Sequence, residues 1–233
     1  MKIIVKLKEK IKRTETVQSF RFIPGKKIDF LPGHFLQVIF DRENLLNKEL
    51  NKYLSFSSSP TRDYIEFTKR LSESPFSQRL KNLSINEEIL IEAPLGNCVF
   101  KEEYKKIGFL IGGIGITPVI SILEYILEKN LSTSVSLLYA NRSEEEIAFY
   151  PELESWQSSG NIKVYFFVDL PSRNNSLIFD KIDKKNINKY IPDIKERITF
   201  IFGHPKMVAE MKSICLSLGI NSERIKTEMF LGY

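Results

Sequence analysis

The chain has 233 residues, of which 42% are hydrophobic, so it is long enough to bury a core in one or two domains. The formal net charge is +5, and the lysines are scattered rather than clustered, which argues against a nucleic-acid-binding protein. An anionic cofactor or an acidic partner protein would account for the positive excess.

Cysteine and histidine are too few for most metal centres. Cys98 and Cys215 cannot supply the ligands of a four-cysteine iron–sulfur cluster, and they lack CxxC spacing. We expect both to be reduced thiols in a cytoplasmic protein. Because His34 and His204 are the only histidines, a histidine-rich metal site is excluded, and we expect no metal ion.

The N-terminal stretch MKIIVKLKEKIKRTETVQSF alternates apolar and charged residues, as a strand does. No apolar core follows its basic start, so it does not resemble a signal peptide. No apolar run in the chain approaches the roughly 18 residues of a transmembrane helix, so we expect no membrane span.

Period-two alternation predicts strands through the first hundred residues. The alternating stretches are 3–11, 17–23, 34–40, 64–71 and 88–96, with turn clusters between them. Five or six short strands at this spacing predict a small antiparallel β-barrel or sandwich. Ser74 followed by Pro75 predicts the start of one helix over 74–83.

The pattern changes near residue 105, where a continuous apolar stretch is typical of a parallel strand buried on both faces. Strands are predicted at 105–113, 134–142, 161–169, 197–205 and 225–233, and helices at 117–130, 144–157 and 206–219. This alternation predicts a doubly wound α/β domain with a parallel sheet. We therefore expect two domains, 1–102 and 103–233.

The stretch FLIGGIGITP, residues 109–118, places three glycines where the first strand of the α/β half meets a helix. Thr117 is the expected N-cap of that helix and Pro118 its first residue. Free N–H groups at a helix start can bind a pyrophosphate, and glycines let the backbone approach it. The spacing is not GxGxxG, and a tight turn without a ligand is the alternative.

Four further stretches could carry chemistry. GHPKM, residues 203–207, ends a second parallel strand, and two such ends can line one crevice. KYLSFSSSP, residues 52–60, offers hydroxyls for a polar ring system, or is only an exposed edge. SESPFSQRL, residues 72–80, could bind phosphate or simply cap a helix. EMFLGY, residues 228–233, could stack aromatic rings on a ligand or pack in the core.

In order and spacing these segments resemble the ferredoxin–NADP reductase superfamily, in which a flavin-binding β-barrel precedes a nicotinamide-binding α/β domain. The resemblance covers nearly the whole chain. The matching segments are LPGHFLQV, KYLSFSSS, SPFSQRL, APLGNCVF, GGIGITP, GHPKM and EMFLGY. Each of them is weak alone, and the seven in family order are a strong signal.

The resemblance implies a role for each matching position. Lys52 takes the place of an arginine that meets the flavin phosphate, Leu54 that of a tyrosine on the flavin ring, and Ser55 that of a hydroxyl near flavin N5. The implied flavin-binding set is Lys52, Tyr53, Leu54, Ser55, Phe56, Ser57, Thr68, Lys69, Arg70, Ser74, Pro75, Phe76 and Ser77.

The nicotinamide dinucleotide is expected at the second group of positions. The implied set is Gly113, Gly115, Thr117, Pro118, Arg142, Gly203, His204, Pro205, Phe230 and Tyr233. Glu228 borders the hydride-transfer face, and Tyr233 covers the flavin where nicotinamide enters. Ser55 and Glu228 are the expected catalytic residues.

Three departures from the family pattern bear on these roles. Lysine binds phosphate as a point charge where arginine forms a fork, and leucine at position 54 removes an aromatic stack. Both changes weaken the choice of FAD over FMN. Phe202 stands where relatives carry a cysteine close to the nicotinamide.

The resemblance therefore predicts a flavoprotein reductase that passes hydride from NAD(P)H to bound FAD, and then electrons to a separate acceptor. A small acidic carrier such as ferredoxin or flavodoxin would suit the +5 charge. The alternatives are a reductase of free flavin and a non-catalytic electron-transfer subunit. Arg142 and Ser143 could meet a 2′-phosphate and favour NADPH slightly over NADH, although Arg142 could instead pair with a neighbouring glutamate. We expect a monomer.

Overall fold

The computed structural model describes residues 1–158 and 160–230. The chain folds as two compact units. The first comprises Met1–Phe100 with Thr117–Lys129, and the second comprises Lys101–Ile116 with the chain from Asn130 onward. Within the described ranges, no helix is both long enough and apolar enough to cross a lipid bilayer.

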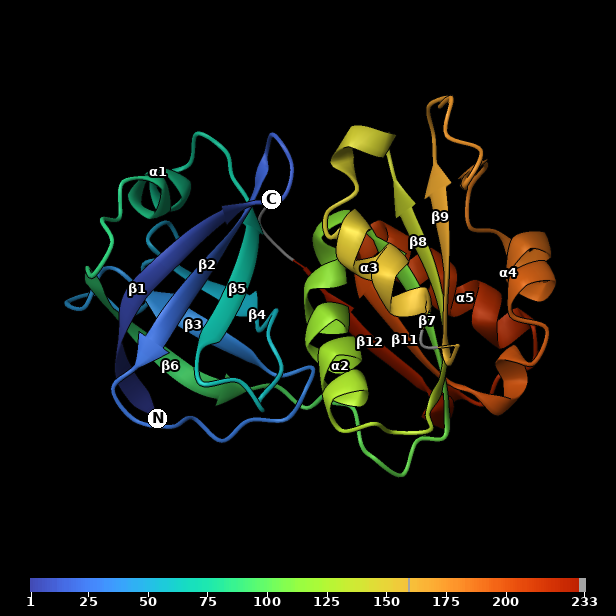
Figure 1. The fold of residues 1–233 in the computed structure, drawn as a ribbon, viewed down its shortest axis with the longest axis horizontal. Helices are drawn as coiled ribbons and strands as arrows, with labels where there is room; N and C mark the ends of the chain where they lie inside the picture. The colour runs from blue at the N-terminus through green and yellow to red at the C-terminus, as the bar shows by residue number, and fades with distance from the viewer. Residues whose placement is uncertain (159, 231–233) are drawn as a thin grey trace. The chain divides into compact units, whose positions relative to one another are not determined.

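The first unit is built on an antiparallel sheet in the order β4-β3-β6-β1-β2-β5 (Figure 1). Its strands are β1 (Lys2–Lys12), β2 (Val17–Pro24), β3 (Phe35–Ile39), β4 (Asn51–Ser55), β5 (Ile65–Arg70) and β6 (Glu88–Leu95). A bridge between Phe56 and Phe67 joins the two edges of this sheet. The edge strands are thereby closed, which confirms the predicted antiparallel barrel.

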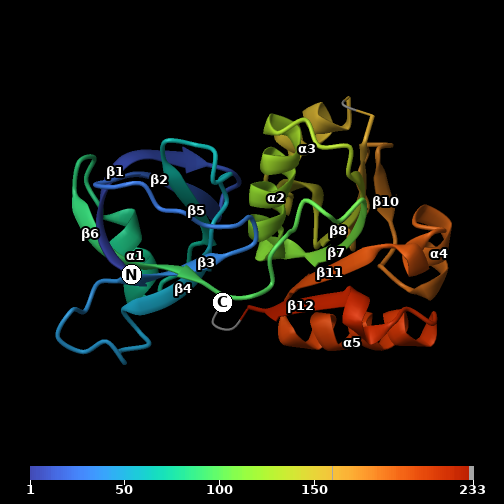
Figure 2. The same ribbon diagram turned by 90° about the horizontal axis from the view of Figure 1, so that it is seen from below.

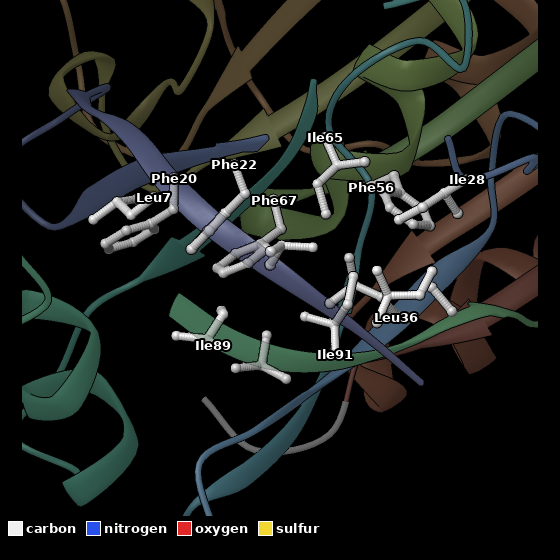
Figure 3. Close-up of a cluster of buried hydrophobic side chains, with 14 of the residues drawn as sticks. Leu7, Phe20, Phe22, Ile28, Leu36, Phe56, Ile65, Phe67, Ile89 and Ile91 are labelled. Carbon is white, nitrogen blue, oxygen red and sulfur yellow. The ribbon is translucent and has the colours of Figure 1, made fainter. Parts of the chain in front are cut away.

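The barrel interior is filled by the apolar residues of the alternating strands (Figure 3). In β1 the side chains of Ile3, Val5 and Leu7 are buried while their neighbours face solvent. Phe67 stacks on Phe22 at a centroid distance of 5.2 Å. The period-two pattern thus specifies which face of each strand forms the core.

Helix α1 (Pro75–Lys81) follows β5 and begins as predicted. The Ser74 hydroxyl accepts a hydrogen bond from the main-chain N–H of Ser77 and caps the helix. The side chains of Phe76 and Leu80 are fully buried in the barrel core.

The second unit is built on a parallel sheet in the order β10-β9-β8-β7-β11-β12 (Figure 2). Its strands are β7 (Lys106–Gly112), β8 (Ser134–Asn141), β9 (Ile162–Val168), β10 (Leu177–Phe179), β11 (Ile198–Gly203) and β12 (Ile225–Met229). The strand order reverses at β7, which has β8 on one side and β11 on the other. This reversal is the point where open α/β sheets bind ligands.

The helices of this unit are α3 (Tyr150–Gln157), α4 (Lys184–Tyr190) and α5 (Pro205–Ser217). Helices α4 and α5 share a core with one face of the sheet, to which Leu110, Leu138 and Ile201 contribute. On α3, the Tyr150 ring lies 4.7 Å from that of Phe166 in β9. The predicted doubly wound α/β architecture is confirmed.

Several predicted boundaries were wrong. The helix expected over 144–157 begins only at Tyr150, because Phe149 adopts a left-handed conformation with φ 61°. Residues 144–146 form a separate 3₁₀ turn. The last strand ends at Met229, and β10 and α4 were not predicted because their short segments lack a long apolar pattern.

Candidate functional site

Ser55, at the end of β4, has the environment expected of a ligand-binding hydroxyl. The residue is 6% exposed, and its hydroxyl has no hydrogen-bond partner within the described residues. The hydroxyl oxygen is not fully enclosed by the protein, so it can meet water or a ligand. Ser55 is therefore suited to the predicted contact near flavin N5.

The serines that follow it already have protein partners. The Ser57 hydroxyl donates to Glu66 Oε1 at 3.1 Å and lies 2.8 Å from Thr68 Oγ1. The Ser58 hydroxyl accepts from the Glu66 N–H at 2.9 Å, and the Ser59 hydroxyl bonds to Thr61. The serine run is thus mainly structural, and flavin contacts of Ser57 and Thr68 stay predictions.

Two lysines face the same side of the barrel without a counter-ion. Lys52 on β4 and the buried Lys69 on β5 form no hydrogen bond or ion pair with any described residue. Burial lowers the pKa of Lys69, and the charge of Lys52 lowers it further. Two close cations without a carboxylate fit an anion such as a flavin phosphate. Arg70, beside them in sequence, donates to Thr16 Oγ1 at 3.1 Å.

No aromatic side chain of β4 can replace the missing family tyrosine. Leu54 packs against the barrel core, in register with Leu36. Tyr53 points to the opposite face of the strand, is 64% exposed and meets Phe35 edge-on at 5.8 Å. Phe56 stacks on Phe30 inside the barrel at 4.0 Å.

At the start of α1, the hydroxyl of Ser77 lies 3.1 Å from that of Ser74 and 3.3 Å from that of Ser72. The simple capping interpretation is therefore confirmed for Ser74, and a phosphate role is compatible with it. Since Phe76 is buried, only its main chain can take part in such a contact, and Pro75 has no N–H to donate.

The glycine loop has one crowded and one open position. A Cβ at Gly115 would lie 2.4 Å from the Phe202 carbonyl oxygen, whereas a Cβ at Gly113 would have no atom within 4 Å. Gly113 adopts φ +51°, which favours glycine. Gly115 is thus required for packing, and Gly113 leaves room above the loop for a ligand.

The helix after this loop starts differently from the prediction. A 3₁₀ turn over Gly113–Ile116 runs directly into helix α2 (Thr117–Glu128). Thr117 is therefore the first helical residue and not the N-cap, because the 3₁₀ turn already supplies the preceding backbone bonds. Pro118 occupies the first turn, where its missing N–H costs nothing.

The end of β11 also brings glycine and a helix start together. His204 is the N-cap of α5, and its Nδ1 accepts from the Lys206 N–H at 3.3 Å. Pro205 is the first residue of the helix. Gly203 adopts φ +154°, and a Cβ there would lie 3.3 Å from the Gly112 carbonyl oxygen, so both the backbone conformation and the packing favour glycine.

Glu228 on β12 lies next to Phe202 of β11 in the parallel register. Its carboxyl group has no hydrogen-bond partner among the described residues, and burial raises its pKa to about 7. Phe230 follows β12, and its N–H donates to the Gly203 carbonyl at 2.9 Å. Tyr233 lies outside the described residues.

At the end of β8, Arg142 is exposed and forms no ion pair with Glu145 or Glu146 in the described structure. The alternative surface pair is therefore absent there. Sequence reasoning missed the preceding residue, Asn141, whose amide is buried and unpartnered. A polar residue closing the apolar run SVSLLYAN was the available signal.

Both expected groups fit the residues present. In the first unit, the unpartnered Ser55 hydroxyl and the lysine pair match the polar ring and phosphates of a flavin. In the second unit, the open Gly113 and the switch point at β7 match a dinucleotide pyrophosphate. No group of three or more metal-ligating side chains occurs within the described ranges.

Comparisons with known proteins support a nicotinamide-binding oxidoreductase. The family model described as "Oxidoreductase NAD-binding domain" matches residues 109–213. NADH-cytochrome b5 reductase 1 of Dictyostelium discoideum is 29% identical over 228 residues, which cover 95% of this chain and 79% of that protein.

Solved structures show the same fold. The FAD/NAD-binding domain of nitric oxide dioxygenase from Vibrio cholerae superposes with a TM-score of 0.84 at 19% identity, covering 98% of each chain. Ferredoxin-NADP+ reductase from Plasmodium falciparum superposes with a TM-score of 0.81 at 20% identity, covering 98% of this chain and 96% of that one.

The fold, the motifs and these matches define a flavin-dependent NAD(P)H oxidoreductase. The resemblance predicted from the motifs is confirmed: the chain is similar in sequence to NADH-cytochrome b5 reductase 1 and in fold to ferredoxin-NADP+ reductase. The predicted cofactor class, FAD with a nicotinamide dinucleotide, is the one for which the Vibrio cholerae domain is named.

Proposed function

We propose that the protein oxidises NADH or NADPH by means of bound FAD and passes the electrons to a separate one-electron carrier protein. The observation that carries the proposal is the unpartnered hydroxyl of Ser55, a residue only 6% exposed, on the strand that also bears Lys52. When bound, the flavin supplies the redox chemistry, because it accepts two electrons together and can release them singly.

The residues of this chain then have four tasks. Lys52 and Lys69 neutralise the flavin phosphates, and the Ser55 hydroxyl forms a hydrogen bond at flavin N5. The backbone of the Gly113 loop receives the dinucleotide pyrophosphate. Glu228, with a pKa of about 7, can hold or release a proton near neutral pH.

The net charge of the chain supports an acidic carrier. Ferredoxin and flavodoxin stay the proposed partners, since an acidic surface complements a chain of net charge +5. The Dictyostelium relative is named for cytochrome b5, which is a second candidate of the same class. The cytoplasmic location and the monomeric state stay predictions.

The choice of nucleotide has support on both sides. The exposed, unpaired guanidinium of Arg142 supports NADPH, because it is free to meet a 2′-phosphate. The name of the relative supports NADH. Titration with each nucleotide decides between them.

The test is anaerobic mixing of the FAD-loaded protein with each nucleotide while the flavin absorbance is followed. In the wild-type protein, the absorbance of the bound flavin should be lost in a single turnover after mixing. Ser55→Ala should keep its flavin and slow the bleaching by about tenfold to a hundredfold, the scale of a lost hydrogen bond to the reacting centre.

Ser58→Ala is the matched control, since the Ser58 hydroxyl is buried and accepts a hydrogen bond from the Glu66 N–H. It should lower the melting temperature and leave the bleaching rate within about twofold of wild type. A wild-type protein that fails to bleach with either nucleotide contradicts the proposed function. Equal rates in wild type and Ser55→Ala contradict the role of Ser55 alone.

A further inference from the structure

Helix α2 belongs to the first compact unit, although the chain on both sides of it belongs to the second. It begins directly after the 3₁₀ turn Gly113–Ile116, which contains the glycine loop expected to receive the pyrophosphate. The helix is therefore covalently continuous with that loop while its packing groups it with the barrel. Any contact that fixes α2 to the barrel also restrains the end of the glycine loop.

The two acidic side chains of α2, Glu124 and Glu128, are four residues apart and lie on the same face of the helix. Both lie in its C-terminal half, where the helix dipole disfavours negative charge. Their side chains are only 15% and 24% exposed. The stability of the helix by itself does not account for them, so their partners lie outside α2.

Those partners come from one loop of the barrel, which follows the serine run after β4. The Glu124 carboxylate accepts from the Ser59 main-chain N–H at 2.6 Å and from Arg62 Nη2 at 2.7 Å. Arg62 Nη2 also lies 2.7 Å from Glu128 Oε1, and the Thr61 hydroxyl donates to Glu128 Oε2. A main-chain donor, a guanidinium and a hydroxyl of one loop thus bind one face of α2.

The same loop is joined to the strand that bears the flavin-binding hydroxyl. Ser59 follows Ser55 by four residues, and the Ser57 N–H between them donates to the Glu66 carbonyl of β5 at 2.7 Å. This short segment is therefore held in the wall of the barrel. Through it, Glu124 connects α2 with the end of β4.

We propose that Glu124 is a positioning residue for hydride transfer. By holding α2 on the loop that contains Ser59 and Arg62, it restrains the glycine loop relative to the strand that bears Ser55. The inference rests on the proposed function, because it assumes that hydride passes from the nicotinamide to the flavin. Such a step depends steeply on geometry, since a misplacement of about 1 Å can slow it about a hundredfold.

Glu87 provides a matched control within the same unit. Its carboxylate also accepts from a main-chain N–H, that of Ser84 at 2.9 Å, and from a guanidinium, that of Arg79 at 2.6 Å. None of these three residues lies on α2. Glu87→Ala should therefore lower the melting temperature and leave the rate of flavin reduction unchanged.

The experiment follows flavin bleaching in the FAD-loaded protein, anaerobically and without an electron carrier, over a range of nucleotide concentrations. The nucleotide is NADH or NADPH, whichever reduces the wild type faster. Glu124→Ala should lower the limiting rate at saturating nucleotide by about tenfold to a hundredfold, with the half-saturating concentration and the FAD content within about twofold of wild type. Glu124→Gln should fall between the two, because its amide oxygen can still accept from the Ser59 N–H.

Arg62→Ala removes the other side of the contact and should also lower the limiting rate. The double variant Glu124→Ala/Arg62→Ala should be no slower than Glu124→Ala, since both residues act through one contact. Amide hydrogen exchange of the protein without cofactors tests the contact apart from activity. The Ser59 N–H should be protected in wild type and in Glu87→Ala, and should exchange faster in Glu124→Ala.

A limiting rate in Glu124→Ala equal to that of wild type would overturn the inference, and so would a Ser59 N–H that exchanges equally fast in both. A loss of nucleotide or FAD binding as large as the loss of rate would assign Glu124 to binding and not to positioning. An equal loss of rate in Glu87→Ala would show that stability alone controls the rate. These outcomes leave the proposed function intact, whereas a wild-type protein that neither nucleotide bleaches refutes both.

Discussion

At the scale of single residues, the environment of Glu228 makes a prediction about pH. Its pKa is raised to about 7 by burial, while an exposed glutamate ionises near pH 4.5. The folded state therefore favours the neutral acid, and the free energy of unfolding falls as pH rises from about 4.5 to 7. Glu228→Gln removes this loss and should stabilise the protein at pH 8 by on the order of 2 kcal/mol, and much less at pH 5.

Thermal unfolding of both proteins at pH 5 and pH 8 measures this difference. The flavin-reduction rate of wild type should also change with an apparent pKa near 7, and that step should vanish in Glu228→Gln. A stability difference that is the same at both pH values would show that Glu228 ionises normally in the folded chain.

At the scale of elements, two glycines of the 3₁₀ turn after β7 are expected to have different roles. Gly115 allows close packing, and Gly113 leaves space for a ligand. Gly115→Ala places a Cβ against the Phe202 main chain and should destabilise the protein by about 1–3 kcal/mol. Gly113→Ala meets no atom, so its cost is the left-handed backbone, roughly 1–2 kcal/mol. Its Cβ would point into the space expected for the pyrophosphate, so it should weaken NADH binding by more than tenfold.

Melting temperatures and NADH dissociation constants of the two variants check this distinction. At a temperature where both are folded, Gly115→Ala should bind NADH nearly as well as wild type. If Gly113→Ala binds NADH normally, the loop does not receive the pyrophosphate at that position.

At the scale of the whole molecule, the net charge of +5 predicts salt-dependent electron transfer to an acidic carrier. Raising NaCl from about 0.05 M to 0.3 M shortens the screening length by about 2.5-fold and should slow reduction of ferredoxin, flavodoxin or cytochrome b5 by at least about threefold. Reduction of an uncharged quinone should change little. If both acceptors respond alike to salt, electrostatic attraction does not guide the carrier.

Local sequence was sufficient for much of the fold. Alternation in the first hundred residues and continuous apolar runs after residue 105 reflect one-sided and two-sided burial of strands, and both sheets follow from them. The Ser74 cap and the glycines of the β7 turn are also local, because each depends on the conformation of adjacent residues. The seven family motifs predicted the class of protein, a flavin-dependent oxidoreductase.

The tertiary structure decided which polar groups remain available to a ligand. The motif singled out Ser55, but the sequence did not show which serines of this stretch have protein partners. Glu66 and Thr68, distant along the chain, take up the Ser57 hydroxyl, and no described residue takes up that of Ser55. Folding also created three other features that the sequence did not show: the lysine pair without a counter-ion, the raised pKa of Glu228 and the buried amide of Asn141. Burial and hydrogen-bond pairing depend on residues brought together by folding, so no local pattern encodes them.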